Sequence, residues 1–175
     1  FRRKLAPQSL DAHFTGDDGG SYVCTGTLLN SSGGAFTPYF YTANHCFGTQ
    51  AAASSLTTHW FYDRAACGAG DTGSSYVQVT GGSALLYANS TTDVMLLRLN
   101  QNPPSGAIFS GWDAAAVSTG VPLTAVHHPA GDWKKVSLLD IAKRTSPTAT
   151  TRTAPADAIS VKRLCFRVMA MVSVS

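Results

Sequence analysis

The sequence predicts an all-β protein of antiparallel strands, arranged as a β-barrel or a sandwich. Hydrophobic residues make up 44% of the 175 residues and charged residues only 13%, a composition that excludes a disordered chain or a coiled coil. Short β-branched and aromatic runs alternate with clusters of Gly, Ser and Asn, and this spacing is typical of antiparallel barrels and sandwiches. All 16 glycines lie at or before Gly131, so the residues after it have a different composition.

Six strands are predicted between His13 and Asn100, each a short run rich in β-branched and aromatic residues. They are Tyr22 to Leu29, Tyr39 to Ala43, Leu56 to Tyr62, Tyr76 to Thr80, Ala84 to Tyr87 and Val94 to Leu99. Turns are expected where Gly, Ser and Asn cluster, at Asn30 to Gly34, Gly68 to Ser75 and Gly81-Gly82. Three alanines allow a short turn of helix at Gln50 to Ser55.

A polar, proline-bearing break at Gln101 to Gly106 is the predicted domain boundary. After it the strand pattern resumes at Ile108 to Trp112 and at Leu123 to Pro129. The pattern fails from Leu139 onward. The predicted units are therefore residues 10–102, residues 106–138 and a tail at residues 139–175 that is unlike the rest.

Charge is unevenly distributed along the chain. Residues 1–133 hold five basic residues and eight Asp, whereas residues 134–175 hold eight basic residues and two Asp, and Glu is absent. Because the net charge of +3 arises in the tail, we predict neither a nucleic-acid partner nor membrane binding. The basic residues Arg2, Arg3 and Lys4 have no apolar run behind them, so they do not form an intact secretory signal, and we expect a processed or incomplete product.

Two segments carry the candidate chemistry. In Thr42-Ala43-Asn44-His45-Cys46 a strand ends at a histidine and a cysteine, with Cys24 22 positions before Cys46. If the two cysteines are joined, the bridge closes a loop of about 23 residues and stabilises the fold by about 3 kcal/mol. In the second segment Asp93 heads a strand whose apolar residues share its face. Its partly buried carboxylate needs a hydrogen-bond donor, and an imidazole N–H is a suitable one.

These residues resemble those of the trypsin-like serine peptidases of chymotrypsin fold, and among them the bacterial lysyl endopeptidases. The matching segments keep their order and spacing from Ser21 to about Leu138. They are Cys24-Thr25-Gly26-Thr27-Leu28, Tyr39 to Cys46, Thr58 to Tyr62 with Cys67, Thr92 to Asn100, Gly111-Trp112-Asp113 and Ala125 to Pro129.

The resemblance implies a double-barrel hydrolase, with a first β-barrel at residues 10–102 and the start of a second at 106–138. It implies His45 as general base, Asp93 as the carboxylate that orients it, and a Cys24–Cys46 disulfide. It also implies a protein or peptide substrate cleaved through an acyl-enzyme, no cofactor, and a secreted, extracellular protein. Cys67 corresponds to a family disulfide whose partner lies in an N-terminal extension, so we expect it to be a free thiol here.

The sequence departs from the family pattern where the nucleophile is expected. The family places it in a Gly-x-Ser-Gly turn beyond the His-His-Pro segment, and no glycine follows Gly131. Ser105 and Ser110 each precede a glycine but lie in the link between the barrels. We therefore assign no nucleophile and expect this chain alone to be inactive. Two explanations stay open for residues 139–175: a frameshifted or disordered tail, or divergence into a non-catalytic homologue that binds protein partners.

His127-His128-Pro129 offers imidazole ligands that could join His45 and Cys46 on zinc. Its spacing matches no common zinc motif, and adjacent residues of a strand point to opposite faces. We therefore predict no metal and no cofactor.

Overall fold

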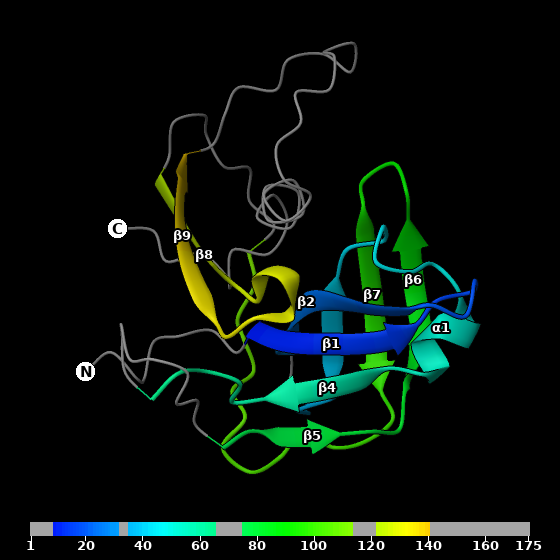
Figure 1. Ribbon diagram of the computed structural model, residues 1–175, viewed down its shortest axis with the longest axis horizontal. Coiled ribbons are helices and arrows are strands. Elements are labelled where there is room, and N and C mark those ends of the chain that lie inside the picture. Colours follow the sequence, from blue (N-terminus) through cyan, green and yellow to red (C-terminus); the bar gives the residue numbers. More distant parts are fainter. Residues whose placement is uncertain (1–8, 32–34, 66–74, 114–121, 141–175) are drawn as a thin grey trace.

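The computed structural model describes residues 9–31, 35–65, 75–113 and 122–140 (Figure 1). Within these ranges the strands form two antiparallel sheets, one of seven strands in the order β5-β4-β1-β2-β3-β7-β6 and one hairpin of β8 and β9. The elements are β1 (Ser9–Thr15), β2 (Ser21–Leu29), β3 (Tyr39–Thr42), α1 (Gln50–Ser54), β4 (Thr57–Trp60), β5 (Val77–Val79), β6 (Ser83–Asn89), β7 (Val94–Leu99), β8 (Pro122–His127) and β9 (Lys135–Asp140). The predicted all-β, antiparallel class is confirmed.

The six strands predicted before Asn100 correspond to β2 through β7, and the predicted turn of helix is α1. The sequence pattern missed β1, whose residues Asp11, Ala12 and His13 are poor strand formers. β1 is a strand because β2 and β4 pair with its two sides. The expected turns at 32–34 and 68–74 lie outside the described residues.

The strand predicted at Ile108 to Trp112 is wrong. In the described chain this segment has a single parallel bridge, in which Ser110 N donates to Leu28 O and Asn30 N donates to Ser110 O, each at 2.8 Å. Gly106 has a positive φ of 88° and Gly111 follows the bridge. Glycines at these positions weaken an extended ladder, so the pairing stops after one residue.

The seven-stranded sheet is strongly curled. Its two edge strands, β5 and β6, are joined by only Thr80, Gly81 and Gly82. Such a link reaches at most about 15 Å, whereas seven strands side by side in a flat sheet span about 29 Å. The sheet must therefore roll until its edges approach, as the first barrel of the predicted fold requires. Figure 1 shows α1 beside β6 at this end of the sheet.

The core fills the inside of the rolled sheet. On β1, alternation directs Leu10, Ala12 and Phe14 inward, with 0%, 1% and 4% of their surface exposed. The other buried core side chains come from β2, β3, α1, β4, β7 and the link between α1 and β4, and include Leu28, Phe40, Ala53, Leu56, Trp60, Met95 and Leu97. Gly26 is needed in this core, because a Cβ there would overlap the Phe40 ring. The other face of β1, with Asp11 and His13, points out of the core.

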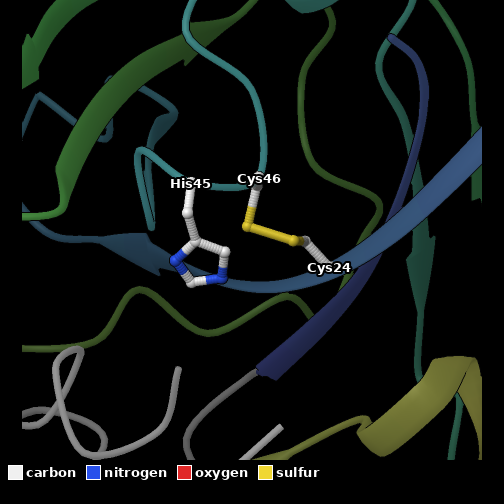
Figure 2. A group of neighbouring side chains, drawn as sticks. All are labelled: Cys24, His45 and Cys46. Atoms are coloured by element: carbon white, nitrogen blue, oxygen red, sulfur yellow. A yellow bond between two sulfur atoms is a disulfide. The ribbon is translucent and has the colours of Figure 1, made fainter. Parts of the chain in front are cut away.

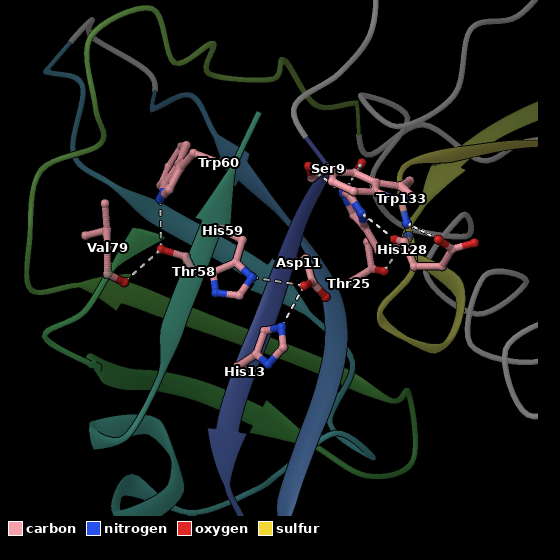
Figure 3. Close-up of polar contacts among 11 residues, drawn as sticks. Ser9, Asp11, His13, Thr25, Thr58, His59, Trp60, Val79, His128 and Trp133 are labelled. Atoms are coloured by element: carbon pink, nitrogen blue, oxygen red, sulfur yellow. Dashed lines mark hydrogen bonds and ion pairs between the residues drawn. The ribbon is translucent and has the colours of Figure 1, made fainter. Parts of the chain in front are cut away.

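The β8–β9 hairpin is attached to the outside of this sheet through the segment that follows β8. His128 N donates to Thr25 Oγ1 at 2.9 Å, and its buried ring lies 3.1 Å from the Ser9 carbonyl (Figure 3). Trp133 stacks on Tyr62 with ring centroids 4.2 Å apart. No helix in the described ranges is long and apolar enough to span a membrane.

Candidate active site

His45 lies in the turn that ends β3. The turn is closed by Cys46 N, which donates to Ala43 O at 3.2 Å. Cys46 is joined to Cys24 of β2 by a disulfide, which lies directly beside the His45 ring (Figure 2). Thr42 Oγ1 donates to Thr25 O at 2.9 Å and ties the same turn to β2 a second time. The histidine is thus held on a backbone that is fixed to the neighbouring strand.

Asp93 lies in the turn that joins β6 to β7, just before β7 begins at Val94. Asn89 Oδ1 accepts a hydrogen bond from Thr92 N at 2.9 Å and holds the turn. Asp93 has a φ of 56°, in the left-handed region that Asp and Asn enter more readily than most residues. β3 pairs with β7, so this turn and the His45 turn meet at the same end of the sheet.

The Asp93 carboxylate holds His45 by two hydrogen bonds. His45 Nδ1 lies 2.7 Å from Oδ2, and the backbone N of His45 donates to Oδ1 at 2.8 Å. The Asp93 side chain is 4% exposed and the His45 side chain 47% exposed. An ionised carboxylate at Nδ1 selects the tautomer with the proton on that atom. Nε2 then carries the lone pair, as a general base requires.

A small apolar cluster is built from residues that adjoin this pair in the chain or pack against them. Tyr41, Ala43 and Val94 are buried together, and Leu29 and Cys46 pack against them. Tyr41 and Ala43 lie on the face of β3 opposite to Phe40, because side chains alternate along a strand. The Asp93 side chain, next to Val94, is itself buried, which strengthens the hydrogen bonds that its carboxylate accepts.

The four site residues predicted from the sequence, His45, Asp93, Cys24 and Cys46, come together at one end of the sheet. Within the described chain, the hydrogen bonds of His45 all go to Asp93. Ser110 is elsewhere, buried and 3.3 Å from Thr27 Oγ1. The predicted free thiol at position 67 and most of the tail lie outside the described residues.

The ligand atoms of Cys24, His45 and Cys46 lie within 4.8 Å of one another. Both sulfurs are in the disulfide, and zinc binds thiolate sulfur, so the oxidised pair does not form a zinc site. His127 Nε2 lies 2.8 Å from Ser137 Oγ, whereas His128 is bound to Ser9. The two adjacent histidines therefore have separate partners.

Asn89 and Thr42 were not predicted as site residues. Each supports a turn that carries one of the two candidate catalytic side chains. The signal for Asn89 is present in the sequence only as residue type, because Asn favours turns and its side chain bonds nearby backbone N–H groups, here three residues on. Thr42 has no such signal, since its partner carbonyl belongs to another strand.

Comparison with known proteins places this chain in a family. Residues 4–163 match the model of the lysyl endopeptidase C-terminal domain. A lysyl endopeptidase from Pseudomonas aeruginosa is 41% identical over 122 residues, which cover 69% of this chain. The chain spans about a quarter of the length of this relative, 26%.

Solved structures show the same fold at low sequence identity. The HtrA-type protease AlgW, solved with a tripeptide, has a TM-score of 0.52 at 17% identity over 83% of this chain and 40% of its own. A protease from M. tuberculosis in its active form has a TM-score of 0.53 at 13% identity over 81% of this chain and 51% of its own. The trypsin-like protease fold predicted from the sequence is thus confirmed.

Proposed function

The chain belongs to the lysyl endopeptidase family, and on this premise we propose that it forms the histidine and aspartate half of a serine endopeptidase active site. In this proposal His45 takes the proton of a serine hydroxyl, and Asp93 orients the imidazole and stabilises the imidazolium. The rolled sheet is the first barrel, and the β8–β9 hairpin begins the second.

The observation that carries the proposal is the double hydrogen bond of the Asp93 carboxylate to the ring and the backbone of His45, at 2.7 and 2.8 Å. A histidine that only filled space beside a disulfide would not need a buried carboxylate on its Nδ1. The second contact fixes the carboxylate relative to the His45 backbone, so the imidazole orientation is set before substrate binds.

The substrate class follows from the relatives. Their name supports a polypeptide cleaved at lysine, and the Cys24–Cys46 disulfide supports an oxidising, extracytoplasmic location. No serine is assigned as nucleophile, so the proposal for the chain by itself is an incomplete site without hydrolytic turnover.

A chimera tests the proposal. Residues 1–138 are fused to the segment of the Pseudomonas aeruginosa lysyl endopeptidase that follows the matching position. We expect the chimera to hydrolyse a lysyl ester and to react with a fluorophosphonate probe, whereas the 175-residue chain does neither. Asp93→Asn should lower the kcat of the chimera by about 10³- to 10⁴-fold, and His45→Ala should lower it further.

Two results decide against the proposal. A folded chimera without turnover would favour the non-catalytic homologue that binds protein partners. Labelling of a serine in the unfused chain would show that a nucleophile is present after all. The ratio of lysyl to arginyl ester hydrolysis does not test the roles of His45 and Asp93, because the fused segment would contribute to this ratio.

A further inference from the structure

A second cluster of ionisable side chains lies on the outer face of the rolled sheet. Asp11 and His13 are two residues apart on β1 and share a face, and His59 of β4 is the direct cross-strand partner of Asp11. His13 Nε2 lies 2.6 Å from Asp11 Oδ2, and His59 Nδ1 lies 3.2 Å from the same oxygen (Figure 3). One ligand atom from each residue falls in a group whose members are all within 4.8 Å.

We propose that Asp11, His13 and His59 form a binding site for a divalent transition-metal ion of the Zn²⁺ class. None of the three belongs to the His127-His128 segment considered from the sequence. The pairing of β1 with β4 brings them together across 48 residues of chain. The site is independent of the proposed peptidase function.

The second oxygen of Asp11 points to a missing partner. The Asp11 side chain is 1% exposed, and its Oδ1 has no hydrogen-bond partner among the described residues. A buried carboxylate oxygen without a partner is destabilising, and a bound ion or water is one explanation for such an atom in a native protein. A cation held through Oδ2 compensates the charge that Oδ2 shares with Oδ1.

The donor set selects the ion. Two imidazoles and one carboxylate suit Zn²⁺ and its first-row neighbours, whereas Ca²⁺ and Mg²⁺ prefer oxygen ligands alone. Three protein ligands leave a further coordination position for water. His13 is 40% exposed and His59 14% exposed, so an ion can reach the cluster from solvent.

The geometry needs only a small adjustment. Ligand atoms around tetrahedral zinc, bound at 2.0 to 2.1 Å, lie about 3.3 Å apart. The His59 contact already has nearly this spacing, and the 2.6 Å His13 contact must widen by less than about 1 Å. The exposed His13 ring has the freedom to do so. Each nitrogen that now donates to Oδ2 releases its proton when the ion binds, and a neutral ring takes up a proton from solvent on its other nitrogen, so that it stays neutral.

Aromatic side chains form the wall of the site. The His59 ring lies 5.0 Å from the Tyr76 ring and 6.1 Å from the Tyr62 ring, centroid to centroid. Burial, together with the neighbouring His13, lowers the pKa of His59.

The test uses the 175-residue chain with Cys67 and Cys165 alkylated under non-reducing conditions, so that free thiols do not bind the probe. Zn²⁺ is titrated by calorimetry, and Co²⁺ reports coordination through its visible absorption. We expect one ion per chain in the wild type. His13→Gln and His59→Gln should each weaken binding by more than about tenfold, since even the outer-shell partners of metal ligands are worth 10- to 100-fold.

His45→Gln is the matched control, because it removes the other partly exposed histidine that is bound to a carboxylate. It should retain full affinity. Asp11→Asn would add a third ligand variant if it folds, but the exposed His13 variant is decisive because circular dichroism can verify its fold. Absence of saturable Zn²⁺ and Co²⁺ binding, or equal binding by the wild type, His13→Gln and His59→Gln, would overturn the proposal.

Discussion

At the scale of single residues, Asp93 combines a backbone conformation with a chemical role. Its left-handed φ of 56° turns the chain into β7, and its carboxylate accepts from both the ring and the backbone of His45. Few side chains satisfy both demands, because most residues pay about 1 to 2 kcal/mol for this conformation. Asn shares the conformational tolerance of Asp.

We therefore expect Asp93→Ala to lower the free energy of unfolding by about 2 to 4 kcal/mol, from the lost hydrogen bonds and the strained turn. Asp93→Asn should be less destabilising by at least about 1 kcal/mol, because Asn retains the turn and one acceptor. Urea unfolding of the three proteins gives the comparison. Equal destabilisation by Ala and Asn would show that the left-handed turn contributes nothing.

His128 makes stability depend on pH. Burial lowers its pKa below the ordinary value of 6.5, outweighing the Ser9 and Asp132 carbonyls and the charge of Asp11, which raise it, while Lys134 adds to the lowering. Below about pH 6.5 the unfolded chain thus binds more protons than the folded chain, so the free energy of unfolding falls as the pH falls.

On acidification from pH 7 the loss approaches about 1.4 kcal/mol for each unit by which folding lowers the pKa, and it is complete only below the folded pKa. Urea unfolding at several pH values measures it, and His128→Gln should flatten the dependence. His59, whose pKa is also lowered, should preserve part of it in that variant. Stability that stays constant or rises on acidification would contradict this account.

At the scale of elements, the link between the two edge strands depends on Gly82. Its φ is 70°, and a Cβ there would overlap the backbone carbonyl of Ser54 at the end of α1. Gly82 N also donates to Leu56 O at 3.1 Å. Gln50 then covers part of the β6 edge, with hydrogen bonds to Ser83 O and Leu85 N. The close approach of this link to α1 therefore helps to roll the sheet.

Comparing Gly82→Ala with Gly19→Ala separates the cost of a left-handed backbone conformation from the cost of a steric overlap. Gly19 has a similar φ of 80°, but a Cβ there meets nothing within 4 Å. We expect Gly19→Ala to cost about 1 kcal/mol for the left-handed backbone and Gly82→Ala about 2 kcal/mol more for the overlap. Thermal or urea unfolding measures both. Equal costs would mean that the link can move away from α1.

At the scale of the whole molecule, the described chain has two parts that are stabilised to different degrees. The seven-stranded sheet encloses a continuous core, whereas β8 and β9 form a two-stranded hairpin held against it by His128 and the Tyr62–Trp133 stack. A two-stranded ribbon is marginally stable in isolation. The hairpin therefore depends on these outer contacts.

Hydrogen exchange should resolve this difference. We expect the amides of β8 and β9 to exchange at least about tenfold faster than those of β2 and β3, because the hairpin can open locally without unfolding the core. His128→Ala should accelerate exchange in the hairpin and leave β2 and β3 nearly unchanged. Equal protection of the hairpin and the sheet in the wild type would show that they unfold as one unit.

The sequence by itself determined the strand class, six of the strands and the pair of candidate catalytic residues. Alternating apolar residues and turn glycines report local conformation and the buried face directly, so β2 to β7 could be predicted. His45 and Asp93 were identified because each stands at the end of a recognisable strand in a motif that resembles a known family.

Three features could be seen only in the tertiary structure: the strand β1, the rolling of the sheet, and the cluster of Asp11, His13 and His59. β1 carries polar residues on the face that points away from the core, and it is a strand because two neighbours pair with it. The cluster depends on the register that sets Asp11 opposite His59. Sequence spacing does not encode such a register, because pairing between distant strands is fixed by the packing of the whole sheet.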